Sequence, residues 1–272
     1  MDSGEDLAII RGSGELPPMI KNIYRKAIYI SFNNSNKTAD KQMIYCEFEK
    51  LGFLFDKLKQ NGIRRVVMAG SITRPQFQKS KMDNYTINLM PKLQEKLVQG
   101  DNELLSFIAA EFEKKGYQIL GASDLVPDLT VDPGFVCGSS YDFFSRDIYK
   151  ADSVLKTLSP EDIGQGVVIE NGLVLGIETL QGTNELLKFV SKTSPHLRIQ
   201  ETGGIFVKRP KANQDLRFDM PVVGPKTVDL ACKAGLRGLV LSPNTVVLLE
   251  REKCIKIAED NNFFILAEES KI

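Results

Sequence analysis

The sequence predicts two α/β domains joined by a linker, the first with a mostly parallel sheet and the second with a mixed sheet. Two observations support this fold class. In the first half, short apolar runs alternate with segments of helical periodicity, which favours parallel strands covered by helices. In the second half, Asn171-Gly172 separates two apolar runs, and this pattern predicts a β-hairpin and therefore antiparallel strands.

Local patterns place the elements of the first domain, residues 1–130. The apolar run Leu7–Ile10 ends in Gly12-Ser13-Gly14, and helical spacing begins at Pro17, so we expect a strand, a glycine turn and a helix. This order is typical of a Rossmann-like domain. The other expected elements are strand 27–32, helix 51–60, strand 66–69 and a long helix that Asp101 caps and Gly116 ends.

The linker is predicted at residues 131–140, within a stretch that contains prolines and glycines but no sustained periodicity. The second domain then covers residues 141–272. The near-continuous apolar character of its hairpin predicts that both faces are covered. Its expected elements are helix 141–158, strands 167–170 and 173–177, helix 184–192, a polar loop 208–217, helix 226–234, strands 238–241 and 246–249, helix 251–261 and strand 263–266.

Composition excludes several classes of protein. The 272 residues carry 35 Lys+Arg and 35 Asp+Glu, so no net basic charge favours a nucleic-acid partner. No apolar stretch approaches the roughly 18 residues of a membrane span, and the acidic N-terminus is unlike a secretory signal, so we expect a cytoplasmic protein. The four cysteines are scattered and His196 is the sole histidine, which argues against zinc, disulfide and His-rich metal sites.

Two turns of the first domain are candidates for phosphate binding. Glycines at Gly12 and Gly14 would let backbone N–H groups approach a phosphate at a helix N-terminus, although a plain tight turn explains them equally well. The third glycine of a dinucleotide-binding motif is missing, which argues against NAD. Arg74 follows strand 66–69 and is expected at the same sheet edge, unless it is only a surface residue.

The loop Lys208–Pro221 holds the densest group of charges. Four cations, Lys208, Arg209, Lys211 and Arg217, suit phosphate oxygens. Two carboxylates, Asp215 and Asp219, suit a divalent cation. A solvated loop has the same composition, so the residues alone leave both interpretations open. In the hairpin region, Thr183 is expected to N-cap the helix that follows.

Taken together, these stretches resemble one family across nearly the whole chain: the UDP-2,3-diacylglucosamine pyrophosphatases of lipid A biosynthesis, of the type unrelated to calcineurin-like phosphoesterases. The order and spacing of the motifs make the resemblance specific. They are Gly12-Ser13-Gly14-Glu15-Leu16-Pro17, Gly70 through Arg74-Pro75, Gly100-Asp101, Asp162-Ile163-Gly164-Gln165-Gly166, Gly182-Thr183 and Gln214 through Gly224.

The resemblance implies Mg²⁺-dependent hydrolysis of UDP-2,3-diacylglucosamine to UMP and 2,3-diacylglucosamine 1-phosphate (lipid X). It places the essential aspartate at Asp219, in the pattern Q-[DE]-x-R-x-D-x-P. It also implies transient contact with the cytoplasmic face of the inner membrane, where a diacylated substrate resides. The implied site comprises catalytic Asp219, metal-binding Asp215 and Asp219, and substrate-binding Gly12, Ser13, Gly14, Arg74, Gly166, Thr183, Lys208, Lys211 and Arg217.

The chain departs from the family pattern where Gln181, Asn184 and Asn102 replace carboxylates. An amide keeps the shape but loses the charge that holds a divalent cation. The alternative function is therefore a degenerate homologue that binds a sugar nucleotide or lipid X without turnover.

Two expectations concern the arrangement of the site. Arg74 and the glycine turn should face the same cleft as the Lys208–Asp219 loop. The acyl chains need apolar surroundings, since burial stabilises by roughly 0.8 kcal/mol per CH₂. We expect a chamber at the domain interface, although its residues could instead pack the second domain's own core. The candidate residues are Phe143, Phe144, Ile148, Leu155, Leu186, Leu187 and Val190.

Overall fold

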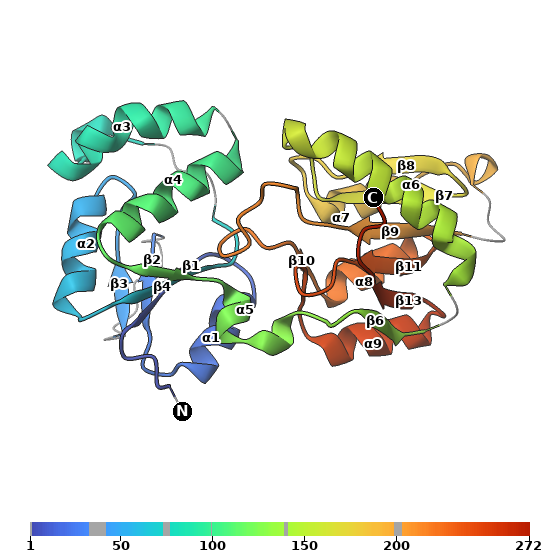
Figure 1. Ribbon diagram of the computed structural model, residues 1–272, viewed down its shortest axis with the longest axis horizontal. Coiled ribbons are helices and arrows are strands. Elements are labelled where there is room, and N and C mark those ends of the chain that lie inside the picture. Colours follow the sequence, from blue (N-terminus) through green and yellow to red (C-terminus); the bar gives the residue numbers. More distant parts are fainter. Residues whose placement is uncertain (1, 33–41, 73–76, 99, 139–140, 199–202) are drawn as a thin grey trace. The chain divides into compact units, whose positions relative to one another are not determined.

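The computed structural model describes residues 2–32, 42–72, 77–98, 100–138, 141–198 and 203–272. The chain divides into two compact units (Figure 1). The first unit comprises Met1–Pro127 together with Arg217–Asp219, and the second comprises Asp128–Leu216 and Met220–Ile272. A short segment of the second half of the sequence therefore belongs to the first unit.

The first unit contains a five-stranded sheet in which every pair of neighbouring strands is parallel. The strand order is β3-β2-β1-β4-β5, so the order reverses between β1 and β4. The prediction of a Rossmann-like domain is thereby confirmed. The strands are β1 (Leu7–Arg11), β2 (Ile28–Ser31), β3 (Met43–Tyr45), β4 (Arg65–Ala69) and β5 (Gln118–Leu120).

Helices cover this sheet because its central strands are apolar on both faces. In β1, Ala8 and Ile10 belong to a core cluster with residues of α2 and α4, while Leu7 and Ile9 are buried on the other face. The helices are α1 (Leu16–Ile23), α2 (Leu51–Gln60), α3 (Asn84–Leu97), α4 (Asp101–Lys114) and the short α5 (Ala122–Leu125).

Two helix starts differ from the predictions. Helix α4 begins at Asp101 itself and Gly100 is its N-cap, so Asp101 is not the cap that we expected. Helix α3 was not predicted, because it buries only Thr86 and Leu93, which gives little apolar periodicity, and because it contains Pro91. The carboxylate of Asp83 nevertheless caps α3 and accepts a hydrogen bond from the N–H of Thr86 at 2.8 Å.

The second unit is built on a mixed six-stranded sheet, as predicted, in the order β6-β13-β11-β9-β7-β8. Strands β9, β11 and β13 are parallel to one another, whereas β6 and β7 run antiparallel to their neighbours β13 and β9. The strands are β6 (Gly134–Cys137), β7 (Gly166–Glu170), β8 (Leu173–Ile177), β9 (Gly204–Lys208), β11 (Leu236–Leu241) and β13 (Phe264–Ala267). A separate parallel pair consists of β10 (Val222–Val223) and β12 (Val247–Leu248).

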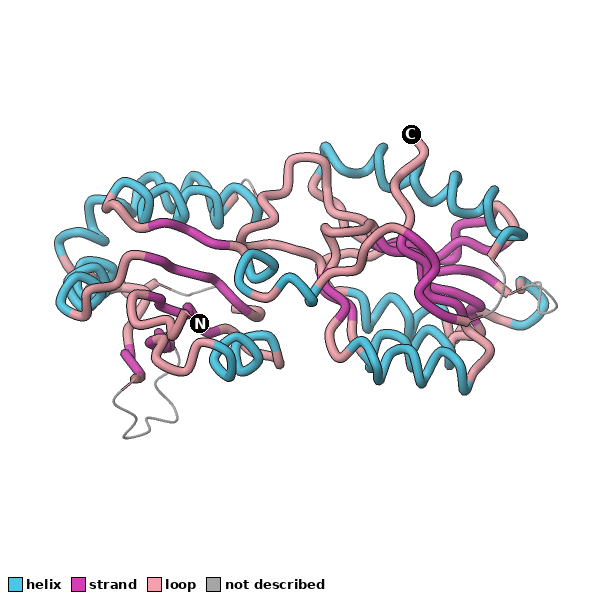
Figure 2. The backbone as a smooth tube through the Cα atoms, turned by 60° about the horizontal axis from the view of Figure 1, so that its bottom comes forward, coloured by secondary structure: helices cyan, strands magenta, loops and turns pink. Residues whose placement is uncertain are grey.

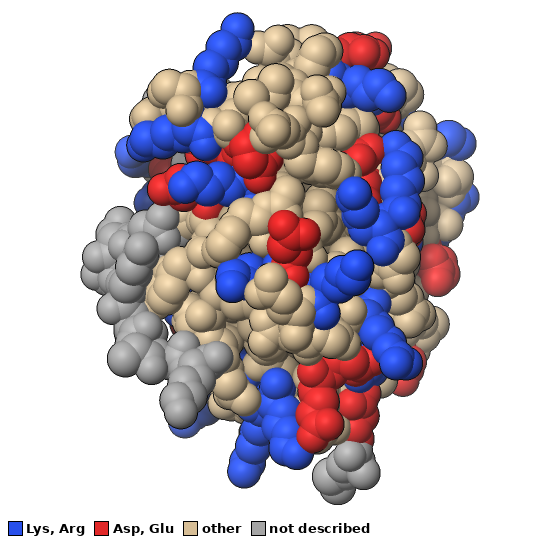
Figure 3. All heavy atoms as spheres, turned by 90° about the vertical axis from the view of Figure 1, so that its left-hand side faces the viewer, with Lys and Arg blue, Asp and Glu red and all other residues tan. Residues whose placement is uncertain are grey.

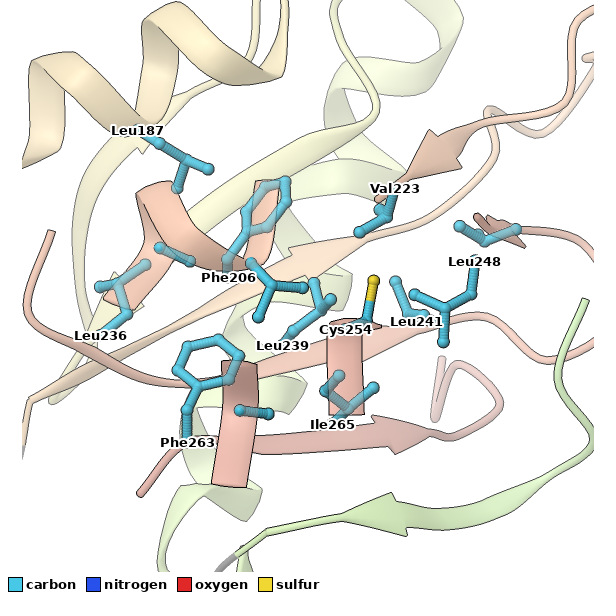
Figure 4. Packing of buried hydrophobic residues seen from close by; sticks show 14 of the residues in the cluster. Leu187, Phe206, Val223, Leu236, Leu239, Leu241, Leu248, Cys254, Phe263 and Ile265 are labelled. Carbon is cyan, nitrogen blue, oxygen red and sulfur yellow. The ribbon is translucent and has the colours of Figure 1, made fainter. Parts of the chain in front are cut away.

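Helices lie on both faces of the mixed sheet (Figure 2). Helix α6 (Ser145–Leu158) covers one face, and α7 (Thr183–Val190), α8 (Pro225–Lys233) and α9 (Arg251–Asp260) cover the other. Figure 4 shows Leu187 of α7, Phe206 of β9 and Cys254 of α9 in the same apolar cluster. This packing fixes the ends of the strands, where the polar residues of the unit gather.

Three predictions for this unit need correction. The stretch 131–140, predicted as linker, contains β6, which pairs with β13. The hairpin is not covered throughout: β7 is buried at all five positions, but β8 is the sheet edge and exposes Leu173 and Val174.

The third correction concerns the acyl-chain chamber, because six of the seven candidate residues are buried in the unit's own core. Phe144, Ile148 and Leu155 pack between α6 and the sheet, and Leu186, Leu187 and Val190 pack on the opposite face. Phe143 is exposed instead. These residues hold the second unit together, so they do not support the predicted chamber.

Candidate functional site

The glycine turns of the first unit lie where the strand order of its sheet reverses. Gly12 follows β1 and Gly70 follows β4, and the N–H of Gly12 donates to the carbonyl of Ala69 at 2.7 Å. Ser13 and Ser71 exchange backbone hydrogen bonds of 2.8 and 3.1 Å. In open α/β sheets, ligands bind beyond the carboxyl ends of the strands at this reversal point. The structure therefore brings two predicted motifs to the expected edge.

Glycine is required at these turns by contact between their backbones. A Cβ on Gly12 would lie 2.4 Å from the carbonyl carbon of Gly70, and a Cβ on Gly70 would lie 2.3 Å from the carbonyl oxygen of Ser13. No real Cβ approaches backbone so closely, so neither glycine can be replaced without moving a strand end. The plain structural role that we considered for these glycines is therefore confirmed for Gly12.

The following turn is more open. Gly14 has a φ of +98° and nothing lies within 4 Å of the position of a Cβ, so a ligand can reach its backbone. Helix α1 offers fewer donors than we expected, because Pro17 and Pro18 have no N–H. The Ser13 hydroxyl donates to the carbonyl of Ser71 at 3.2 Å. Arg74 lies outside the described residues, so its place at this edge stays a prediction.

The segment Arg217–Asp219 lies at the same edge of the first unit. The Cα of Arg217 is 3.4 Å from the position of a Cβ on Gly121, the residue that directly follows β5. Because β1, β4 and β5 are parallel neighbours, their carboxyl ends share one edge, and β1 and β5 are separated by about 10 Å at strand spacing. Residues 12 and 217, distant in sequence, thereby lie at the same edge of the sheet.

Arg217, predicted as a phosphate ligand, forms an ion pair within the first unit. Its Nη1 is 2.6 Å from Oε1 of Glu113 on α4, and both side chains are partly exposed. Phe218 packs against the core cluster below α2 and α4. Phe218, the residue before Asp219, therefore attaches the segment Arg217–Asp219 to the first unit.

A buried polar cluster in the second unit contains three of the predicted site residues. Nζ of Lys208 lies 2.6 Å from Oε2 of Glu178 and 2.8 Å from Oγ1 of Thr183. Since an ammonium group only donates, the Thr183 hydroxyl accepts from Lys208 and gives its own hydrogen to Oε1 of Glu178, at 2.9 Å. Gly166 leaves room for the cluster, because a Cβ there would lie 2.6 Å from Oε2 of Glu178.

This cluster shows that Thr183 is not the N-cap that we predicted. The N-cap of α7 is Gly182, and the Thr183 hydroxyl is committed to Glu178 and Lys208. Glu178 itself was not among the predicted site residues. Its position is the signal that could have identified it. Glu178 is a carboxylate directly after the apolar strand β8, and Lys208 is a cation at the end of the apolar strand β9.

The beginning of the charged loop is attached to residues that precede β7. Lys211 forms an ion pair with Asp162, and the N–H of Ala212 donates to Oγ of Ser159 at 2.7 Å. The guanidinium of Arg209 is buried and donates to Oδ1 of Asp152 at 2.9 Å. Arg209, one of the four cations expected to suit phosphate oxygens, is therefore paired with a carboxylate instead. Its partner Asp152 was missed, since the pair joins the end of β9 to α6 and has no local signature.

Carboxylate oxygens are the donors available for a magnesium ion. The described residues contain no group of three or more His, Cys, Asp or Glu side chains that could hold a metal. Magnesium keeps several waters and needs only one or two protein carboxylates in addition to substrate phosphates, so Asp215 and Asp219 fit such a site by donor type. Asp219 belongs to the first unit and Asp215 to the second.

Charged side chains of both signs lie on the surface. On the face shown in Figure 3, Lys and Arg side chains are interspersed with Asp and Glu side chains. Among the described residues, no helix is long and apolar enough to cross a membrane.

The fold defines a two-domain α/β protein whose polar clusters lie at the ends of the sheet strands. Residues 6–129 match the LpxI N-terminal domain, and residues 138–266 match the LpxI C-terminal domain. A relative from Caulobacter vibrioides, the UDP-2,3-diacylglucosamine pyrophosphatase LpxI, is 33% identical over 220 residues, which are 80% of this chain and 79% of that protein. The chain belongs to the LpxI family.

Proposed function

We propose that this protein hydrolyses the pyrophosphate bond of UDP-2,3-diacylglucosamine and releases UMP and 2,3-diacylglucosamine 1-phosphate (lipid X) in lipid A biosynthesis. The observation that supports this activity most directly is the match of both domains to a relative that carries this name. The shared sheet edge of the glycine turns and the Asp219 segment supports a pyrophosphate site in the first unit.

The side chains have distinct roles in this proposal. The open backbone at Gly14 receives a phosphate oxygen, and the carboxylate of Asp219 orients the attacking water. Lys208 and Lys211 supply positive charge in the second unit, each next to a carboxylate that holds it in place. Arg74 is proposed as a further phosphate ligand.

Magnesium is proposed as the cofactor. Asp219, with Asp215 as a second candidate, would hold the ion through carboxylate oxygen. When bound, the ion supplies charge that stabilises the phosphate oxygens of the substrate and of the transition state. This role is consistent with the donor chemistry, since magnesium prefers carboxylate, phosphate and water oxygens.

The substrate also determines where the protein would act. A lipid with two acyl chains resides in a membrane, so we propose that the protein is cytoplasmic and touches the cytoplasmic face of the inner membrane transiently. Cosedimentation with lipid vesicles tests this contact. If the substrate-loaded protein stays in the supernatant at every lipid concentration, the peripheral location is wrong.

The alternative is a binding protein without turnover. Gln181 and Asn184 stand where the family usually has carboxylates, and Gln181 forms a hydrogen bond with Thr179 in the loop before α7. These amides lack the negative charge that attracts a divalent cation. The alternative therefore predicts substrate affinity without UMP release.

The experiment that separates the two functions measures UMP release from UDP-2,3-diacylglucosamine, with Mg²⁺ and with a chelator. The proposed activity predicts UMP release that the chelator suppresses and added Mg²⁺ restores. Substrate binding measured by calorimetry, without any UMP release, would establish the alternative. UMP release that the chelator does not affect would remove magnesium from the proposal but retain the hydrolase.

A further inference from the structure

Asp219 is carried by a segment that belongs to the first unit although its neighbours in sequence belong to the second. The chain enters the first unit at Arg217 and leaves it after Asp219. Just beyond this segment, the carbonyl of Pro221 accepts a hydrogen bond from Val247 at 2.8 Å within the second unit. A three-residue segment with both flanks attached elsewhere needs contacts of its own to stay on the first unit.

Two side chains contribute such contacts. Phe218 packs against the apolar cluster of the first unit, and Arg217 pairs with Glu113 at 2.6 Å. The backbone of Arg217 also approaches Gly121 closely, at the carboxyl end of β5. Exposed ion pairs contribute little to stability, so the value of the pair lies in fixing the orientation and register of the segment.

We propose that Glu113 and Phe218 are positioning residues, which dock the Arg217–Asp219 segment and thereby hold the Asp219 carboxylate at the edge that carries the glycine turns. Phe218 supplies the apolar anchor, and Glu113 selects one orientation by pairing with Arg217. This inference rests on the proposed function, because it assigns the docking a role in turnover. It also assigns Arg217 a docking role in place of phosphate binding.

Loss of the contacts made by Glu113 and Phe218 should affect substrate binding and turnover differently. The backbone at Gly14 and the lysines of the second unit keep their places, so ground-state binding is preserved. The Asp219 carboxylate is then correctly placed for only part of the time, so kcat falls while KM stays nearly unchanged.

A charge exchange tests the role of Glu113. Glu113→Arg and Arg217→Glu each place like charges together, and the double variant restores an opposite pair. We expect each single variant to lower kcat about tenfold or more, and the double variant to return it to within about threefold of wild type. Glu103→Arg is the matched control, because Glu103 also lies on α4 in an exposed ion pair, with Lys96. It should leave kcat unchanged.

Amide hydrogen exchange of residues 215–220 gives a readout that does not require activity. We expect faster exchange in both single variants and in Phe218→Ala, and wild-type exchange in the double variant and in Phe218→Leu. Thermal unfolding identifies any variant that fails to fold, and Phe218→Leu, which keeps the apolar anchor, is then the variant to compare.

The outcomes distinguish the inference from the function on which it rests. Restored protection together with restored kcat supports the positioning role. Restored protection without restored kcat overturns it, because Arg217 would then act on the substrate directly. Unchanged exchange in all single variants also overturns it. If wild type releases no UMP but the exchange results hold, the docking is supported and the proposed hydrolase is what fails.

Discussion

Nζ of Lys208 lies 2.6 Å from the Glu178 carboxylate, and both residues are almost fully buried in the second unit. The pair joins the end of β9 to the residue after β8, and Thr183 links both groups to the first turn of α7. A buried charge without its partner is strongly unfavourable, whereas a pair removed as a whole costs much less. In the second unit, the buried charge of Lys208 and that of Glu178 therefore each depend on the other for stabilisation.

The first prediction concerns this compensation. Glu178→Leu leaves the Lys208 ammonium without its carboxylate, and we expect the free energy of unfolding to fall by about 3–5 kcal/mol. The double variant Glu178→Leu with Lys208→Met should recover at least half of that loss. Urea denaturation measures both. Glu185→Gln, which breaks the exposed pair with Lys188 on α7, is the control and should leave stability unchanged. If the double variant is less stable than Glu178→Leu alone, the two buried charges do not stabilise each other.

The second prediction concerns the catalytic carboxylate. Asp219→Asn should abolish UMP release while calorimetric affinity for the substrate stays largely intact, because the charge acts mainly in the transition state. A variant that keeps more than about a tenth of wild-type turnover, under about 1.4 kcal/mol of activation free energy, would show that Asp219 is not essential.

Asp215→Asn is the matched comparison for Asp219→Asn. If Asp215 also holds the metal, its variant should need a higher Mg²⁺ concentration for half-maximal turnover. An unchanged Mg²⁺ requirement would restrict the proposed metal-binding role to Asp219.

The third prediction concerns the glycine turns. Gly12→Ala forces a Cβ against the backbone of Gly70, so the ends of β1 and β4 must separate, and we expect a large loss of thermal stability or no folded protein. Gly14→Ala meets no neighbouring atom and is destabilised only by its positive φ, by about 1–3 kcal/mol. If this variant folds but loses affinity for the substrate, the phosphate-binding role of Gly14 is supported. Equal thermal stability of the two variants would contradict the interlocked geometry.

How far the sequence predicts this protein depends on how local each signal is. The strand Leu7–Arg11 and the Asn171-Gly172 turn were predicted because apolar runs and turn residues act over a few positions. Strand β9 was missed, because its last residue is a lysine and its apolar run is only three residues long. Its burial comes from neighbours that are distant in sequence.

The candidate site shows the same limit. Motif spacing indicated Gly166, Thr183 and Lys208 separately, and only the fold shows that a shared carboxylate, Glu178, joins two of them. The partner of Arg217 was also hidden, since Glu113 is more than one hundred residues away along the chain. The apolar residues assigned to an acyl chamber were misplaced because a ligand-lining pattern and a core-packing pattern are identical in sequence.

The last prediction is a pH dependence that originates at Glu111 in the first unit. Burial acts to raise the pKa of Glu111, but hydrogen bonds from Lys114 and from Tyr85, the latter at 2.9 Å, outweigh it and hold the pKa below the ordinary value of 4.5. A depressed folded-state pKa gives stability that is present above about pH 4.5 and is lost as the pH falls through the folded-state value.

The hydrogen bond between Tyr85 and Glu111 lowers the pKa of Glu111 but raises that of Tyr85. Burial and the hydrogen bond to Glu111 raise the pKa of Tyr85 to about 12, so its contribution to stability is present below pH 10 and is lost as the pH rises toward 12. Glu111→Gln should therefore flatten the acid side of the stability profile and move the tyrosinate absorbance transition of Tyr85 to lower pH. Tyr85→Phe identifies which absorbance belongs to this residue, and Glu103→Gln on the same helix is the control. A wild-type tyrosinate transition in Glu111→Gln would show that burial alone sets the pKa of Tyr85.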